Sequence, residues 1–386
     1  MNMDAHTYDL RTWRRHLHQN PEFGFEETGT ARFVVEKLRS FGFTDIVEGI
    51  GGTGIVATLR RGTGARTIAL RADMDALRIP EHTNLPYASK TAGLMHACGH
   101  DGHTTMLLGA ARLLATEGGF DGSVCFVFQP AEEWGQGMKA MLRDGLGTRF
   151  TFHEIYGLHN KPGLAVGRFE TRTGAFMAAE DNFEIRVRGS GGHASQPHQC
   201  RDAIVCACAI VMELQTIVAR NIDPAVLAVV SVTEIQSDGT RNAIAGEARI
   251  EGDCRNFDPA VSAAIEGAMR RIVAGVASAH NCEAEVVYTR VFVPLINDAA
   301  ATSHALEAAR AVFGADAVTG DAPREGGAED FAHALAHAPG NFANIGNGDT
   351  ALCHSPHFDF NDDALAHGVR YFAELVRRRM PELSVQ

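Results

Sequence analysis

The sequence predicts an α/β protein in which a domain with a largely parallel sheet between helices is interrupted by a smaller, ferredoxin-like α+β domain. Three observations carry this prediction. Apolar strands alternate with helices through residues 1–178, as in sheets covered on both faces. Residues 179–291 follow the order β-α-β-β-α-β, which is typical of a ferredoxin-like module. Strands and helices alternate again over residues 292–386, so the smaller domain is inserted into the larger one.

In the first part, residue periodicity predicts helices over 7–18, about 26–40 and 103–115. Gly42 ends the second of these helices, because glycine commonly follows a helix C-terminus. Short apolar runs bounded by turn residues predict strands over 55–59, 67–71, 123–128 and 154–158. Pro130 halts the third of these strands, directly before a pair of glutamates.

The inserted domain begins with a strand whose apolar residues alternate, since Phe183, Ile185 and Val187 fall on one face. The same criteria predict further strands over 225–235, 248–254 and 283–291, with helices over 202–219 and 260–279. The closing part is predicted to contain helices over 303–313, 330–336 and 362–379 and a strand over 341–345. The alternation of these elements returns the chain to the larger domain.

Composition limits the class of protein. A chain of 386 residues is too long for one ordinary core, so two domains are expected. The formal charge of −12 without basic clusters argues against nucleic acid and anionic membranes as partners. No apolar run reaches membrane length, the polar N-terminus has no signal-peptide pattern, and eight cysteines form no disulfide framework. A soluble, cytoplasmic protein with reduced thiols is therefore expected.

One stretch concentrates metal-binding side chains. Residues 95–103 contain one cysteine, three histidines and an aspartate, directly before a predicted helix. The simplest interpretation is a buried thiol among surface histidines. The alternative is a metal site, because thiolate and imidazole are preferred ligands of zinc-like ions. Cys98 and His100 lie two residues apart, so both side chains would leave an extended segment on the same side.

Other polar residues fall at the carboxyl ends of predicted strands, where sheets of this class bind their ligands. They are Asp73, Glu132, Glu133 and His159. His354 adds a further imidazole, so the candidate ligands become one thiolate, three imidazoles and one carboxylate. That set is too large for one catalytic zinc with an open position and suits two ions that share a ligand and a water.

The adjacent glutamates have two interpretations. They are either solvated charges at a helix start, where the helix dipole favours acids, or a metal ligand beside a general base. The second interpretation is favoured because successive side chains point in different directions and the other ligand-bearing segments lie nearby. A carboxylate beside two metals can take a proton from water and pass it to a leaving nitrogen.

The chain resembles the M20 metallopeptidase family, and specifically its aminoacylase-like branch of hippurate hydrolases, N-acyl-amino-acid amidohydrolases and auxin-conjugate hydrolases. The segments that carry the resemblance run in order through nearly the whole chain. They are residues 14–22, 69–77, 95–103, 130–133, 157–160, 191–194, 328–331 and 354–362. The resemblance implies a catalytic domain with an inserted lid or dimerisation domain and a homodimer.

The resemblance also implies roles for individual residues. Two divalent ions (zinc, manganese or cobalt) would be bound by Cys98, His100, Glu133, His159 and His354. Glu132 would be the general base. His193 would reach the partner subunit's site and stabilise the oxyanion of the tetrahedral intermediate. Asn242 would lie near the substrate.

The chain departs from the family pattern in three places. Asn242 is followed by Ala-Ile-Ala rather than Val-Ile-Pro, and the usual Gly-Thr-x-Arg reads Gly-Asp-Cys-Arg, ending at Arg255. Arg255 is a candidate for pairing with a substrate carboxylate, against the simpler interpretation of an ordinary salt bridge. Cys353 replaces a larger apolar residue and is expected to serve in packing. We expect His96, His103 and His357, with Asp73, Asp75 and Asp101, to surround the ligands rather than bind metal.

The expected reaction is hydrolysis of the amide bond of an N-acyl amino acid to a carboxylate and an amino acid. A dipeptidase or carboxypeptidase that uses the same site is the alternative enzyme. A metal-binding or interaction protein on a degenerate scaffold is the alternative outside enzymes. It is disfavoured because all five ligand positions and the base are present. The acyl group, the amino acid and the metal are not specified by the sequence.

Overall fold

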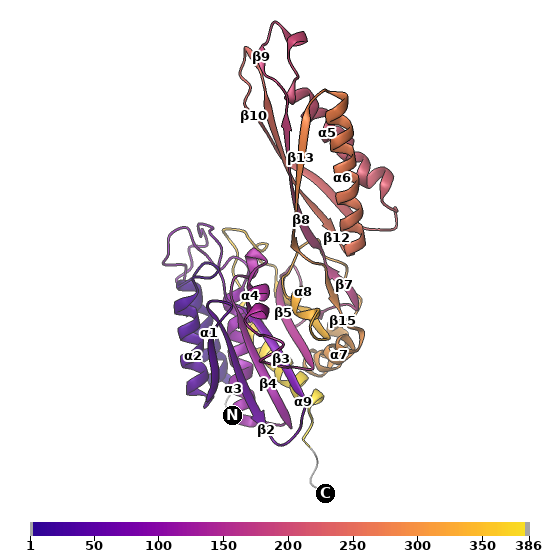
Figure 1. Cartoon of the computed structure of the whole chain (residues 1–386). Coiled ribbons are helices and arrows are strands. Elements are labelled where there is room, and N and C mark those ends of the chain that lie inside the picture. The colour runs from indigo at the N-terminus through magenta and orange to yellow at the C-terminus, as the bar shows by residue number, and fades with distance from the viewer. Residues whose placement is uncertain (1–2, 383–386) are drawn as a thin grey trace. The chain divides into compact units, whose positions relative to one another are not determined.

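The computed structural model describes residues 3–382, and side chains from Asp9 onwards, and it divides into two compact units (Figure 1). The larger unit extends to Phe176 and includes Ile296–Pro323 and the chain from Glu329. The smaller unit comprises Met177–Leu295 and Arg324–Ala328. Met1 and Asn2, which open the polar N-terminus, lie outside the described residues.

The larger unit is organised around an eight-stranded sheet in the order β1-β2-β4-β3-β5-β16-β6-β15. The four central strands β4, β3, β5 and β16 are parallel to one another, whereas β1, β2 and β6 join through antiparallel pairs. The predicted α/β fold is confirmed, with antiparallel pairing near the edges. The strands are β1 (Asp45–Ile50), β2 (Gly54–Arg61), β3 (Thr67–Asp73), β4 (Gly122–Gln129), β5 (Glu154–Pro162), β6 (Phe169–Glu170), β15 (Val318–Thr319) and β16 (Gly340–Gly348).

Burial along β4 explains why its sequence is continuously apolar. Every residue from Gly122 to Gln129 is buried, as expected for a central strand with both sheet faces covered. Helix α3 packs against β3 and against α1, α2 and α9, while α4 packs against α8 and β4. The helices of this unit are α1 (Met3–Gln19), α2 (Thr28–Ser40), α3 (His100–Glu117), α4 (Gly137–Arg143), α7 (Ala299–Phe313), α8 (Ala332–Leu335) and α9 (Leu365–Arg379).

The start of α3 differs from the prediction. The helix begins at His100, three residues before the predicted start, so Cys98 and His100 do not share an extended segment. Gly99 sits between them with φ of 100°, a backbone conformation that glycine adopts without penalty. The same-side argument for these two side chains was therefore wrong, although both still reach one centre, as described below.

The smaller unit has the predicted ferredoxin-like order β8-α5-β10-β12-α6-β13 (Figure 1). Its antiparallel sheet has the strand order β10-β12-β8-β13, and α5 and α6 pack on it and on each other. Buried and more exposed residues alternate along β8 as predicted. The elements are β8 (Ala179–Arg188), α5 (Ala203–Thr216), β10 (Ala228–Ser237), β12 (Glu247–Asn256), α6 (Pro259–Ala279) and β13 (Glu283–Phe292).

Short strands complete the description. β9 (Gly192–His193) pairs with β11 (Ala243–Ile244), and β7 (Gly174–Met177) pairs with β14 (Leu295–Asn297).

Among the described residues, one helical segment, Ala203–Asn221, is long and apolar enough to cross a membrane. Its Cys206, Ile210 and Leu214 are buried in the core of the smaller unit. Because 33% of the apolar window is buried, the helix packs one face on this core and leaves other apolar side chains exposed.

Candidate metal centre

Loops at one end of the larger sheet bring the candidate ligands together. Cys98 lies in the loop before α3, and His100 is the first residue of that helix. Glu133 follows β4 in a short 3-10 helix, Glu132–Trp134. His159 lies in β5, and His354 lies in the loop after β16. β4, β5 and β16 are central parallel strands, so their carboxyl ends meet at the same edge of the sheet.

The ligand atoms form two overlapping groups. Cys98, His100 and His159 place their ligand atoms within 4.8 Å of one another, and so do Cys98, Glu133 and His354. Cys98 Sγ lies 3.5 Å from His159 Nε2, and His354 Nε2 lies 3.2 Å from Glu133 Oε1. Because the two groups share Cys98, the arrangement suits a pair of neighbouring ions better than one.

Two buried atoms support this interpretation. His100 Nε2 is buried and has no hydrogen-bond partner among the described residues, and the buried Glu133 Oε1 has none there apart from its ion-pair contact with His354 Nε2 at 3.2 Å. Buried polar atoms nearly always have a partner, so each such atom requires an explanation. The two atoms are 3.9 Å apart, which leaves both directed at a common region. A divalent cation bound between thiolate, imidazole and carboxylate donors satisfies them, and these donor types fit zinc-like ions.

Buried carboxylates orient the candidate ligands. Asp75 Oδ1 lies 3.1 Å from His100 Nδ1, and its Oδ2 accepts the backbone N–H of Glu133 at 3.1 Å. Asp73 Oδ1 lies 2.7 Å from Nδ1 of His103, whose Nε2 lies 2.7 Å from Asn160 Oδ1. Both ring nitrogens of His103 are thus engaged, which leaves no free nitrogen for a metal. Such partners fix the ring orientation of metal-binding histidines.

The backbone around the ligands is held in unusual conformations. Ala131, directly before the glutamate pair, has φ of 46°, and His354 has φ of 66°. A Cβ atom added at Gly99 would lie 2.0 Å from Asn160 Oδ1. Non-glycine residues with positive φ cost about 1–3 kcal/mol each and often occur at functional sites. The turns that present Glu132 and His354 are therefore strained.

Electrostatics separate the two adjacent glutamates. Burial raises the pKa of Glu132 well above its ordinary value, and the carboxylates of Glu329 and Glu133 raise this pKa further. Burial alone would also raise the pKa of Glu133, but His354 and His100 hold that pKa below its ordinary value. Burial lowers the pKa of His159, which favours the neutral imidazole that binds metals. The environment therefore favours a charged Glu133 and a Glu132 that can carry a proton.

The remaining histidines near the ligands are placed as follows. His96 is buried, and neither of its ring nitrogens has a hydrogen-bond partner among the described residues. His357 is exposed, with Nδ1 3.1 Å from the carbonyl oxygen of His82. Asp101 is buried, and its Oδ2 lies 2.8 Å from His18 Nδ1. Cys353 packs against the core, and its Sγ also lies 3.8 Å from the carbonyl oxygen of Cys98.

Three predicted residues belong to the smaller unit. His193 is exposed in β9, where Ser195 contacts its Nδ1 through both the backbone N–H (3.1 Å) and Oγ (2.7 Å). Asn242 lies directly before β11, the strand that pairs with β9, and its carbonyl oxygen accepts the N–H of Ala194. Arg255 pairs with Glu180 (2.7 Å) and Asp253 (2.9 Å). These ion pairs agree with the simpler interpretation of Arg255.

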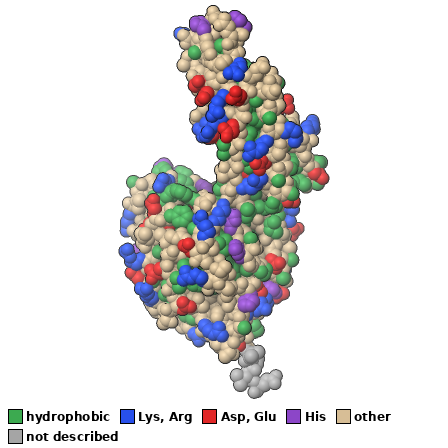
Figure 2. Space-filling model, viewed as in Figure 1, with side chains coloured by type: hydrophobic (Ala, Val, Ile, Leu, Met, Phe, Trp, Pro, Cys, Tyr) green, Lys and Arg blue, Asp and Glu red, His purple; other side chains and the backbone are tan. Residues whose placement is uncertain are grey.

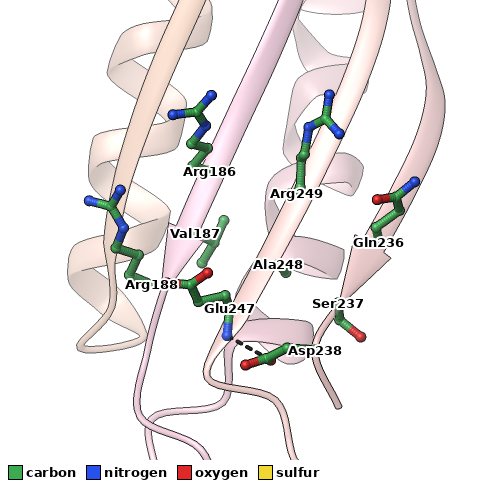
Figure 3. Close-up of a pocket in the computed structure, with 9 residues that line it drawn as sticks. All are labelled: Arg186, Val187, Arg188, Gln236, Ser237, Asp238, Glu247, Ala248 and Arg249. Carbon is green, nitrogen blue, oxygen red and sulfur yellow. Dashed lines mark hydrogen bonds between the residues drawn. The ribbon is translucent and has the colours of Figure 1, made fainter. Parts of the chain in front are cut away.

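A hollow on the surface of the smaller unit is lined by arginine side chains and not by the candidate metal ligands (Figure 3). It has a volume of about 350 Å³ and lies over β8, β10 and β12, with Arg186, Arg188 and Arg249 on its walls. Arg186 and Arg249 both pair with Glu184. Acidic and basic side chains lie side by side on this unit (Figure 2). Arg249 also pairs with Glu251, and Asp238 and Glu247 line the hollow, so acidic side chains offset its basic ones and the hollow is a poor anion site.

The sequence did not reveal a charged network beside Glu132. Arg71 is 1% exposed and contacts Asp73, Gln129, Glu329 and Asp330. Arg71 lies in a predicted apolar strand, and Glu329 and Asp330 lie in a segment that carried the family resemblance. The presence of these residues in segments shared with the family could have pointed to a role near the site. No sequence pattern, however, indicated that the four charged side chains would be buried together.

Comparisons with known proteins identify the family that the chain matches. The family model for peptidase family M20/M25/M40 matches residues 69–378. A hippurate hydrolase of Campylobacter jejuni is 39% identical over 362 residues, which covers 94% of both chains. An N-acetylcysteine deacetylase of Bacillus subtilis is 38% identical over 371 residues and covers 95% of both chains. The structure is also similar to a crystal structure of a Bacillus subtilis protein, which is described as a dinuclear metal-binding peptidase of the M20 family. The TM-score is 0.85 and the sequence identity 34%, and the match covers 98% of this chain and 99% of that chain.

Proposed function

The chain belongs to peptidase family M20/M25/M40 and is a metal-dependent amidohydrolase of N-acyl amino acids, and on this premise we propose how its residues bind two metals and cleave the amide bond. The observation that carries the proposal is the pair of ligand groups that share Cys98, with Glu132 beside them. Relatives named as hippurate hydrolase and N-acetylcysteine deacetylase support an N-acyl amino acid as the substrate class.

Five side chains are proposed to hold the two ions. His100 and His159 would bind on one side of Cys98, and Glu133 and His354 on the other. A bound metal pair polarises the amide carbonyl and makes water a stronger nucleophile at neutral pH. Zinc, manganese and cobalt all accept this mixed set of nitrogen, oxygen and sulfur ligands, so the native ion depends on supply as well as on geometry.

Glu132 is proposed as the general base and then the general acid. It takes a proton from the water whose oxygen attacks the amide carbon. When the carbon–nitrogen bond breaks, it gives that proton to the departing nitrogen, so an amine is released together with a carboxylic acid, which loses its remaining proton to become a carboxylate. A raised pKa suits a group that must both accept and donate a proton near neutral pH.

His193 is proposed to stabilise the oxyanion in the site of a partner subunit, which requires a homodimer. Two features of the smaller unit support this. The Ser195 contacts engage His193 Nδ1, while Nε2 has no recorded partner in the described part of the chain. Apolar side chains are exposed on α5 and on the edge strand β10, including Met212 (69%), Val205 (51%) and Val229 (48%). Unpaired edges and exposed apolar patches are typical of association surfaces. Asn242, directly before the strand β11 that pairs with β9, is proposed to contact the substrate.

The eight cysteines have no disulfide in the described residues, which supports a proposed cytoplasmic location.

The decisive test is a Glu132→Gln variant reconstituted with metal and assayed on N-benzoyl and N-acetyl amino acids, with dipeptides as the alternative substrates. We expect it to keep two ions per chain and lose about 10²–10⁴-fold in kcat. A Glu133→Gln control should instead lose metal. Unchanged kcat in Glu132→Gln would overturn the proposed base, and preference for dipeptides would replace the substrate class.

A further inference from the structure

The guanidinium of Arg71 is matched by acceptors on four residues of the larger unit, which lie on three segments. Its Nε donates to Gln129 Oε1 at 2.7 Å. Its Nη1 donates to Asp73 Oδ2 (2.7 Å) and Glu329 Oε2 (3.3 Å). Its Nη2 donates to Glu329 Oε1 (2.8 Å) and Asp330 Oδ1 (3.3 Å). An arginine has five N–H donors in a fixed planar fork, and here each has an acceptor.

This guanidinium lies among carboxylates that would otherwise repel one another. Glu132, Glu329 and Asp330 are all buried, and their oxygens lie within 4.8 Å of one another. A buried charge without a partner strongly destabilises a folded protein. The positive charge of Arg71 therefore offsets the repulsion between these carboxylates. Lys139 also interacts electrostatically with Asp330. Because the guanidinium bonds two of the three directly, the group is a filled ionic network and not a third cation site.

Glu132 itself is held only weakly. Among the described residues its side chain accepts one hydrogen bond, from the N–H of Asp330 at 3.4 Å. Asp330 is fixed in turn, because its Oδ1 accepts Gln129 Nε2 at 2.6 Å and its Oδ2 accepts the N–H of Met138 at 2.9 Å. The location of the Glu132 carboxylate thus depends on the 329–330 turn, which Arg71 ties to the sheet.

The other side of the guanidinium reaches the metal-binding residues. Asp73 accepts from Arg71 through Oδ2, and its Oδ1 lies 2.7 Å from His103 Nδ1. His103 continues to Asn160, which adjoins His159. Asp73 Oδ2 also lies 3.9 Å from His100 Nε2. One buried side chain therefore connects the support of the base with the support of two metal-binding histidines.

We propose that Arg71 is a positioning residue that keeps Glu132 in register with the metal ligands, through Glu329 and Asp330 on one side and Asp73 on the other. The inference rests on the proposed role of Glu132 as base. Catalytic groups act efficiently only when neighbouring bonds hold them within about 0.5 Å of the productive geometry. Displacement of a reacting group by about 1 Å can cost about 10²-fold in rate.

Arg71→Lys tests the inference, because lysine keeps the charge but cannot reproduce the planar fork. We expect the variant to hold two ions per chain and keep KM within about threefold, while kcat falls about 10²-fold. The matched control is Arg379→Lys. Arg379 donates to Glu154 through Nε and Nη2 in the same unit, so this control also breaks a forked ion pair, and it should leave kcat within about twofold.

A mutant cycle separates positioning from a general loss of structure. If Arg71 acts through Glu132, adding Arg71→Lys to Glu132→Asp should lower kcat less than it does in the wild type, because interacting sites are not additive. Glu329→Gln provides an independent variant of similar shape, and it should lower kcat with metal content unchanged.

Three results would overturn the inference. They are a wild-type kcat in Arg71→Lys, fully additive effects in the cycle, and failure of both Arg71→Lys and Glu329→Gln to fold. The last would make Arg71 a structural ion pair. An unaffected Glu132→Gln enzyme would instead reject the proposed base, so the two failures can be distinguished.

Discussion

The carboxylate of Asp75 bridges His100 and the glutamate pair, with Oδ1 3.1 Å from His100 Nδ1 and Oδ2 accepting the N–H of Glu133 at 3.1 Å. Asp75 is 1% exposed, so solvent does not replace either contact. Asp75, just beyond the end of β3, therefore orients the proposed imidazole ligand His100. It also fixes the backbone of the proposed carboxylate ligand Glu133.

Asp75→Asn should weaken metal binding without unfolding the protein. The amide can still accept the Glu133 N–H through its oxygen, but it offers His100 Nδ1 a poorer partner. Loss of such a supporting contact typically costs 10–100-fold in metal affinity, and we expect about that decrease in a chelator-competition titration. Asp9→Asn, which alters the partly exposed pair with Arg112, is the control and should bind metal normally. Equal affinities in both variants would show that Asp75 does not support the ligands.

Metal removal should lower thermal stability as well as activity. His100 Nε2 is buried without a hydrogen-bond partner among the described residues, so without metal the protein must either leave this atom unpaired or open locally. A ligand at about 100 times its Kd stabilises the native state by about 2.7 kcal/mol. We therefore expect chelation to lower Tm by several degrees and added zinc, manganese or cobalt to restore it. His354→Ala should show a smaller metal-dependent shift, and a Tm that is indifferent to chelator would contradict the proposed centre.

The sequence predicted those parts of the fold that depend on local patterns. β4 is apolar throughout because both of its faces are covered, and β8 alternates because one face is open. It did not predict β1, whose residues Asp45–Ile50 are mostly exposed and lack a clear period. Nor did it predict the early start of α3, because a glycine before a helix does not reveal that the backbone turns into a left-handed conformation there.

The site could be predicted only as a set of residue types at strand ends. Which atoms remain unpaired, such as His100 Nε2, depends on contacts between segments far apart in the chain. The Arg71 network was missed for the same reason. An arginine between apolar residues in a strand is normally expected to reach solvent, and its burial depends on Glu329, 258 residues away.

Stability at low pH should depend on Glu154, at the start of β5. Burial alone would raise its pKa, but hydrogen bonds from Arg379 and Tyr156 lower this pKa from 4.5 to about 2. Because the folded-state pKa is the lower one, the ionised carboxylate stabilises the protein above about pH 4.5, and this contribution is lost as the pH falls towards about 2.

Glu154→Gln should therefore lower the free energy of unfolding by about 1–2 kcal/mol near neutral pH, after allowance for solvent around Arg66 and Arg379, which are 44% and 19% exposed. Denaturant titrations at several pH values should show the difference between variant and wild type shrinking below about pH 4.5. A difference that is constant with pH would assign the effect to packing. The variant should keep its kcat, because Glu154 begins the strand whose far end carries His159.

Replacement of Gly99 should disturb the metal centre. It has φ of 100°, and a Cβ atom there would lie 2.0 Å from Asn160 Oδ1. Gly93 provides a matched control, since it has φ of 76° but no atom within 4 Å of an added Cβ. Alanine at position 93 should cost about 1 kcal/mol through backbone strain alone. Alanine at position 99 should cost clearly more and reduce metal affinity, because relief of the clash must move Asn160 or the Cys98–His100 turn. Chemical denaturation and metal titration of both variants measure the two effects, and equal losses in both would mean that the Asn160 contact does not constrain the ligands.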